Sequence, residues 1–237
     1  MSAAALEALE RDVTGCRTCP RLVAWREAVA AEKRAAYRTE TYWGRPVPAF
    51  GDPAARVVVL GLAPAAHGGN RTGRMFTGDR SGDFLYASLH RTGFANQPTA
   101  VRIGDGLELR DCWITAGVRC APPANKPLPA EREACRRWLD RELALLEQMR
   151  VVVCLGGFAW DVALGSLPAA GAVVPRPRPR FTHGAEADLG TITPLGCFHP
   201  SQQNTFTGRL TPPMMDAVFA RARELAGDAV TSAREAE

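Results

Sequence analysis

The chain has 237 residues, of which 46% are hydrophobic, so it is long enough for one large globular domain or two small ones. Its formal net charge of +4 is modest and does not by itself predict a nucleic-acid partner. No apolar stretch approaches the ~20 residues that a membrane-spanning helix needs, so we expect no membrane partner. All basic residues except Lys33 and Lys126 are arginine, which a GC-rich genome explains, so any DNA binding has to be argued from particular sites.

The amino-terminal region predicts two helices. Leu6, Leu9 and Val13 are spaced as on one face of a short helix. Pro20 is well placed at the first position of a second helix that reaches about Tyr37. We expect these helices to flank a cysteine pair that lies between them.

Four cysteines stand in two separated clusters: Cys16 and Cys19 form a CxxC, and Cys120 and Cys135 follow about a hundred residues later. The first twelve residues contain no apolar run of secretory-signal length, so we expect the thiols to stay reduced in the cytoplasm. Four reduced thiols favour a metal site over disulfides or scattered buried thiols, and they suit either tetrahedral zinc or an iron–sulfur cluster. The other cysteines lie in strand-like or apolar surroundings and are expected to be small core residues: Cys112, Cys154 and Cys197.

Four short apolar and β-branched runs predict strands, at residues 56–62, 112–115, 151–155 and 191–195. The first and third are apolar at successive positions, which is typical of strands buried on both faces. Helical patterns alternate with them, at residues 83–91, 131–150 and 213–226. This alternation predicts an α/β fold in which helices cover both faces of a central, mainly parallel four-stranded sheet.

We expect a single domain over residues 1–227, including the amino-terminal helices, and a polar tail at residues 228–237. The sequence shows no internal repeat. Residues 175–180 read Pro-Arg-Pro-Arg-Pro-Arg, an extended segment that cannot enter a sheet interior because proline has no backbone N–H. We interpret this segment as a rigid surface connection, with phosphate contact as the alternative.

In parallel α/β sheets, ligands bind at the carboxyl ends of the strands, so the loops after the predicted strands are the candidate sites. The loop at residues 61–79 is rich in glycine, which lets backbone amides approach an anion or a flat ring. It matches neither a nucleotide-hydrolase phosphate loop nor a dinucleotide fingerprint. Because Arg71, Arg74, Phe76 and Asp79 crowd into it, we interpret it as a site rather than a flexible connection.

The next two strands also end in candidate loops. Three prolines in residues 119–127 stiffen the loop that holds Asn125 beside Cys120. A rigid amide donates and accepts at once, which suits reading a base edge, although Asn125 can also serve as a turn former. The third strand ends at Gly156 and Gly157, where helix packing explains the glycines nearly as well as phosphate binding does.

The fourth loop, residues 197–210, begins with His199-Pro200-Ser201 and continues with polar residues. Pro200 orients the backbone, His199 can donate to a carbonyl or to developing negative charge, and Ser201 can bond phosphate. Because these residues lie on the ligand edge of the predicted sheet, we interpret His199 as functional. His67 is the only other histidine in a candidate loop.

These motifs stand in one order: the CxxC, Gly-Leu-Ala-Pro at residues 61–64, Arg-Cys-Ala-Pro-Pro-Ala-Asn-Lys-Pro at 119–127, the later Cys135, and His-Pro-Ser-Gln-Gln-Asn-Thr-Phe-Thr-Gly-Arg-Leu at 199–210. Together they closely resemble the iron–sulfur uracil-DNA glycosylases of family 5 (type b), over roughly residues 12–225. The resemblance implies a three-layer αβα sandwich and a structural [4Fe–4S] cluster. It also implies the ligands of that cluster, namely Cys16, Cys19, Cys120 and Cys135.

The resemblance further implies roles for single residues. Phe76 stacks on an extruded base, Asn125 reads its Watson–Crick edge, and His199 bonds the carbonyl nearest the sugar. Ala63 lines the base pocket. Because residues 62–66 hold no side chain that could activate a water, Asp79 is the candidate for that role.

The chain departs from the sister family 4, because Ala116 stands where that family carries an asparagine. We expect the loop at residues 202–210 to enter the minor groove and fill the vacated stack. The residues expected to contact DNA are Ser201, Gln202, Asn204, Arg74 and Arg209.

These observations predict a DNA repair glycosylase that flips and excises uracil, and other deaminated bases such as hypoxanthine, from duplex DNA. We expect a monomer that acts in the cytoplasm, on the nucleoid of a prokaryote. The alternative is an iron–sulfur DNA-binding or sensor protein without glycosylase activity, made plausible by the absence of a first-loop carboxylate.

Overall fold

The computed structural model describes residues 2–227 and contains a five-stranded sheet in the order β1-β3-β2-β4-β5. Four strands pair in parallel, with Val58 opposite both Trp113 and Val152. Strand β1 pairs antiparallel to β3 at the sheet edge. The strands are β1 (Phe50–Gly51), β2 (Val57–Gly61), β3 (Cys112–Ala116), β4 (Val151–Leu155) and β5 (Thr193–Cys197).

The prediction of four strands is therefore one strand short. β1 has only two residues, too few for an alternating or continuous apolar pattern, and prolines at positions 48 and 53 flank it. The four predicted strands exist within two residues of their expected bounds, and the α/β class is confirmed.

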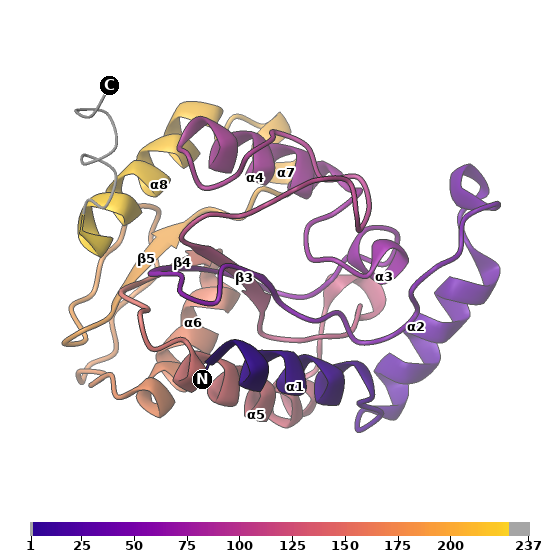
Figure 1. Ribbon diagram of the computed structural model, residues 1–237, viewed down its shortest axis with the longest axis horizontal. Coiled ribbons are helices and arrows are strands. Elements are labelled where there is room, and N and C mark those ends of the chain that lie inside the picture. The colour runs from indigo at the N-terminus through magenta and orange to yellow at the C-terminus, as the bar shows by residue number, and fades with distance from the viewer. Residues whose placement is uncertain (1, 228–237) are drawn as a thin grey trace.

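Helices cover both faces of the sheet and make three layers (Figure 1). Val57 and Val59 point to the face covered by α4 (Arg80–Arg91) and α8 (Pro212–Ala226). Val58 and Leu60 point to the opposite face, which is covered by three helices. These are α1 (Ser2–Thr14), α5 (Pro129–Leu145) and α6 (Gly157–Ser166). Alternate side chains of one strand thus enter two separate cores, which explains its uninterrupted apolar sequence.

The second predicted helix is shorter than expected. Helix α2 (Pro20–Glu32) ends where Lys33 takes a φ of 56°, and a 3₁₀ turn, η1 (Ala35–Tyr37), follows. A residue with a positive φ cannot continue an α-helix, so the expected extension to Tyr37 is wrong. Helix α5 likewise ends at Leu145 and not at residue 150.

The remaining elements are short and lie in the connections: α3 (Gly69–Thr72), η2 (Pro123–Asn125), η3 (Leu167–Ala170) and α7 (Gln202–Phe206). Residues 175–180 form neither helix nor strand, as expected for an extended connection. No helix within residues 2–227 is both long enough and apolar enough to cross a bilayer. The predicted polar tail, residues 228–237, lies outside the described residues.

Candidate active site and cysteine cavity

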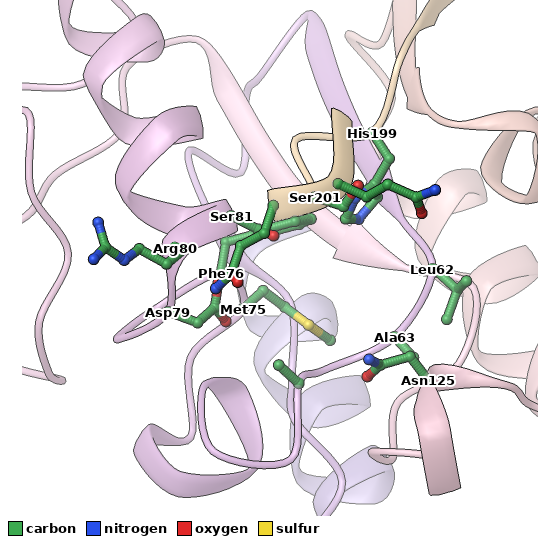
Figure 2. Close-up of a pocket in the computed structure, with 13 residues that line it drawn as sticks. Leu62, Ala63, Met75, Phe76, Asp79, Arg80, Ser81, Asn125, His199 and Ser201 are labelled. Atoms are coloured by element: carbon green, nitrogen blue, oxygen red, sulfur yellow. The ribbon is translucent and has the colours of Figure 1, made fainter. Parts of the chain in front are cut away.

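The loops that follow β2, β3 and β5 meet around a cavity of about 550 Å³ at the carboxyl ends of the strands. Figure 2 shows side chains reaching it from separate segments of the chain. A concave pocket with an apolar wall and a few convergent polar groups is the usual form of a small-ligand site. The lining residues are Leu62, Ala63, Ala65, Met75, Phe76, Asp79, Arg80, Ser81, Asn125, His199, Ser201, Gln202 and Gln203. The structure therefore brings the predicted Ala63, Phe76, Asp79, Asn125 and His199 together.

The position of Phe76 depends on two glycines. A Cβ on Gly82 would lie 1.6 Å from the Phe76 carbonyl oxygen, and a Cβ on Gly61 would lie 2.7 Å from Cζ of its ring. Only glycine at these positions lets the loop lie so close to β2 and α4. Phe76 itself has a φ of 53°, a strained conformation for a bulky residue. Its ring is held in the pocket wall, with its centroid 6.3 Å from that of His199.

Asp79 has two roles in the loop. It is the N-cap of α4, where its carboxylate accepts a hydrogen bond from the Gly82 amide at 3.0 Å. Its Oδ2 lies so close to Gly68 that a Cβ there would approach it to 2.0 Å. Burial raises the pKa of the Asp79 carboxyl, an effect that the helix amides and Arg71 partly oppose. The carboxylate is thus fixed at the pocket wall.

Asn125 stands at the pocket rim on a loop that is anchored from two helices. Arg21 of α2 donates to the Lys126 carbonyl at 3.2 Å and forms a forked pair with Glu131 at 2.8 and 2.7 Å. Glu131 also accepts from the Leu128 amide at 2.7 Å. The Asn125 side chain is exposed, and no partner within the described residues occupies its amide. A fixed backbone with a free amide is suited to binding a polar edge.

His199 follows β5 in a loop that its own side chains hold. Asn204 donates from Nδ2 to the His199 carbonyl at 2.8 Å, and Ser201 caps α7 by accepting from the Asn204 amide at 3.4 Å. Burial lowers the pKa of the imidazole to about 4, so the ring is neutral at pH 7. A neutral imidazole donates one N–H, which can stabilise an anion that forms only during a reaction.

The residues expected to contact DNA fall into three groups, of which the buried Arg74 is the third. Gln202 and Arg209 are exposed, and the Arg209 guanidinium lies 4.6 Å from the centroid of the Phe198 ring. Ser201 and Asn204 are partly buried and hold the loop of His199.

Arg74 does not reach the surface. Its guanidinium is buried, pairs with Asp105 at 2.7 Å and donates to the Thr77 hydroxyl at 2.9 Å. A guanidinium held this way stabilises the loop and does not face DNA, which corrects the expected contact. The sequence showed a cation in a candidate loop but not the aspartate, 31 residues later, that pairs with it.

Two arginines at the site were not predicted. Arg80 lines the pocket and is exposed, directly after the N-cap Asp79. A second, more open cavity adjoins the first, and Arg80, Asn125, Arg34 and His67 line it. Arg34 is also exposed. A helix capped by Asp79 places Arg80 in its first turn, and the sequence could have indicated this. No local pattern in the sequence placed Arg34 beside this loop.

The four predicted cluster cysteines line one small cavity between α2, α5 and the loop after β3. Leu22, Val118 and Trp138 close its walls. Among residues 2–227, no three His, Cys, Asp or Glu side chains are grouped as ligands of a single metal ion. The structure thus brings together cysteines that are up to 119 residues apart in sequence, without arranging them around one ion.

Nitrogen donors point at these sulfurs. The buried Arg26 donates from Nη1 to Cys120 Sγ at 3.0 Å, and its Nε has no hydrogen-bond partner among residues 2–227. The Arg119 amide donates to Cys135 Sγ at 3.3 Å. Burial raises the pKa of the Cys120 thiol to about 12, and the charge and hydrogen bond of Arg26 partly oppose that rise.

Comparison with known proteins places the chain in a family. Residues 48–223 match the uracil DNA glycosylase superfamily. A type-5 uracil-DNA glycosylase of Mycobacterium tuberculosis is 57% identical over 217 residues, which cover 91% of this chain and 80% of the relative. The chain belongs to the type-5 branch of the uracil-DNA glycosylase superfamily. The type-5 enzyme of Thermus thermophilus is 51% identical over 222 residues, or 93% of this chain and 98% of the relative.

The type-5 relatives extend beyond the superfamily match toward the amino terminus. The type-5 uracil-DNA glycosylase of Mycobacterium leprae aligns over 95% of this chain, at 53% identity. The remaining 5% of 237 residues is about 12, so Cys16 and Cys19 lie inside the aligned region. A type-4 enzyme of Archaeoglobus fulgidus is 32% identical over only 56% of this chain. The predicted membership in family 5 is confirmed.

Proposed function

We propose that this protein excises uracil from DNA by hydrolysing the N-glycosidic bond, and that it also releases hypoxanthine. The observation that carries the proposal is the cavity on which Phe76, Asp79, Asn125 and a neutral His199 converge. Membership in a family of type-5 uracil-DNA glycosylases supports the same reaction. The product is an abasic site in the DNA and a free base.

Base recognition requires the nucleotide to leave the stack, because the glycosidic bond is inaccessible inside a duplex. The Phe76 ring supplies a flat face for the extruded base, and Met75, Leu62 and Ala63 complete an apolar wall. The Asn125 amide donates and accepts along the Watson–Crick edge of the base. Because Arg21 holds this loop through Lys126 and Glu131, the Asn125 backbone is positioned in advance, and binding has to order only the side chain.

Cleavage transfers the electron pair of the glycosidic bond to the base and leaves positive charge on the sugar. The N–H of neutral His199 donates to the base carbonyl on which negative charge develops. Asp79 orients a water toward the anomeric carbon and stabilises the positive sugar. The water oxygen bonds to that carbon, and its released proton balances the charge on the departing base.

In this proposal the four cavity cysteines would hold one [4Fe–4S] cluster with a structural role. The residues fit such a group, because Arg26 and the Arg119 amide already donate to the sulfurs. The cluster would join α2 to the loop that carries Asn125. Arg21 makes the same connection through protein groups alone, by bonding Lys126 and Glu131.

DNA approaches the rim formed by α7 and the start of α4. Arg80, Arg209 and Gln202 are exposed there and are available to phosphates and to the minor groove. Phe206, at the end of α7, leaves 76% of its surface exposed and can fill a vacated stack. We propose a monomer that acts on chromosomal DNA of the nucleoid in the cytoplasm.

We expect broad tolerance of the excised base because the loop after β2 lacks side chains that could select one base over another. Residues 62–66 contain no side chain that can hydrogen-bond a base, and an aromatic stack does not distinguish one flat ring from another. Hypoxanthine should therefore be released as well as uracil, and mispaired lesions should be released faster because they are less costly to extrude.

The test is formation of alkali-labile abasic product. Purified protein is incubated with duplexes that carry uracil opposite guanine or adenine, or hypoxanthine, and strand cleavage by alkali is measured at enzyme excess. Product from both uracil duplexes, with slower product from hypoxanthine, is expected. Binding without product would instead identify the DNA-binding or sensor protein, and hypoxanthine release at background would refute broad tolerance alone.

A further inference from the structure

The arginine–proline segment, residues 175–180, takes no part in the pocket, the cysteine cavity or either core. We propose that it is a second DNA-contact surface, which binds backbone phosphates of the duplex flanking the excised base. This inference rests on the proposed function only in taking DNA as the substrate.

The segment is anchored at the ligand edge of the sheet. Trp160 of α6 donates from its indole N–H to the Pro179 carbonyl at 2.9 Å. Phe181, two residues after Pro179, lies against the turn after β4 and the end of β5. A Cβ on Gly157 would approach its ring to 3.6 Å, and one on Gly196 to 3.4 Å. The carboxyl ends of β4 and β5 therefore fix the carboxyl-terminal end of the arginine–proline segment.

A short aromatic series connects this end to the catalytic loop. The rings of Phe181 and Phe198 lie 6.2 Å apart, and Phe198 directly precedes His199. His183 stacks on Phe198 at 4.9 Å, and the Arg209 guanidinium lies over the same ring at 4.6 Å. The carboxyl-terminal end of the segment is thus connected to the loop of His199 through the rings of Phe181 and Phe198.

The arginines of the segment are free to bind anions. Arg176, Arg178 and Arg180 are exposed, and none has an ion pair or hydrogen bond within residues 2–227. Some exposed arginines elsewhere pair with carboxylates, as Arg91 does with Asp216 and Arg221 with Glu186, whereas Arg80 and Arg34 have no carboxylate partner among residues 2–227. Three unpaired guanidiniums, one on every second residue, concentrate positive charge on this surface. Such a surface favours contact with a phosphate backbone.

Proline makes this arrangement stiff. Each proline fixes its own φ and keeps the preceding residue out of the α region, so the segment is stiff without a sheet partner, and the chain bends at Arg176 and Pro177. Less conformational entropy is then lost when they meet phosphates. The four residue steps from Arg176 to Arg180 span at most about 14 Å, by ~3.3–3.6 Å per residue. One DNA strand advances ~3.4 Å per nucleotide, so the segment spans at most about four nucleotides.

The test compares two double variants of the full chain. Arg176→Ala/Arg180→Ala removes two charges of the segment. Arg110→Ala/Arg150→Ala removes two exposed arginines that precede β3 and β4, at the opposite edge of the sheet. The probe is a duplex with a tetrahydrofuran abasic analogue, and its Kd is measured over a salt series. Each lost phosphate contact should reduce the slope of log affinity against log salt by about 0.9.

We expect the segment variant to lose nearly two units of salt slope and the control variant to keep the wild-type slope. Shortening the duplex on the flank that the segment contacts should abolish the difference between wild type and segment variant, while shortening the other flank should not. Equal slopes for all three proteins would overturn the proposal. Abasic product is measured in parallel with wild-type protein, so loss of the salt effect and absence of glycosylase activity are separate results.

Discussion

The most specific prediction concerns Gly61→Ala, a change that adds one methyl group and replaces no catalytic side chain. Gly61 ends β2, and a Cβ there would meet Phe76 Cζ at 2.7 Å and Cε2 at 3.0 Å. The third neighbour, the Thr115 carbonyl, stays at an ordinary 3.7 Å. Because carbon atoms prefer a separation of ~3.5–4.0 Å, the Phe76 ring has to move by about 1 Å.

The displacement should reduce catalysis more than stability. Phe76 borders the open pocket, so its ring can turn into that space, and unfolding should become easier by only about 1 kcal/mol, the lower end for overpacking. A misplacement of about 1 Å at a reacting centre costs on the order of 10²-fold in rate, or about 2.7 kcal/mol in the barrier. We therefore expect excision of uracil to slow by roughly 10–100-fold with a small change in Tm.

Single-turnover excision on a duplex with uracil opposite guanine measures this effect. Gly165→Ala is the matched control, since a Cβ at that position of α6 meets no atom within 4 Å. The change at Gly61 should have no further effect in a Phe76→Leu background, because the ring that it displaces is already gone. A wild-type rate for Gly61→Ala would refute the role of the Phe76 ring in stacking the base.

Three other predictions test separate parts of the site. Asn125→Ala should slow excision on the order of 10²-fold while binding to an abasic duplex changes little; equal losses would mean that Asn125 only positions DNA. Because burial lowers the pKa of His199 to about 4, protonation should begin to remove the active neutral ring only below about pH 5, so a fall in rate centred near pH 6.5 would contradict its assignment. Wild-type protein should be brown, and Cys135→Ser should lose iron and solubility together, whereas colourless protein with one zinc per chain would exclude the cluster.

Much of the fold was predictable because its signals are local. The valine run of β2 and that of β4 are apolar at every position, and each is buried on both faces of the sheet. The position of His199 followed from the same reasoning, since a motif directly after a predicted parallel strand lies on the ligand edge. The prediction of an αβα fold with one parallel sheet was therefore enough to locate most of the candidate site.

The features that the sequence could not predict depend on contacts between residues that are far apart in the chain. Arg74 and Arg80 look alike in sequence, yet Asp105 pairs with the first and leaves the second at the surface. The two-residue β1 forms only because β3 offers an edge to Phe50 and Gly51. Contacts of this kind join segments tens of residues apart, and no periodicity records them.

The central claim is that the pocket lined by His199 and Phe76 cleaves the glycosidic bond of uracil in DNA. It is tested most directly by alkali-labile product from a uracil-containing duplex, measured at enzyme excess for wild-type protein beside His199→Ala. The account predicts complete conversion by wild-type protein and a rate about 10²–10³-fold lower for the variant, with both binding abasic duplex equally well. No product from iron-loaded wild-type protein, or an unchanged rate for His199→Ala, would contradict it.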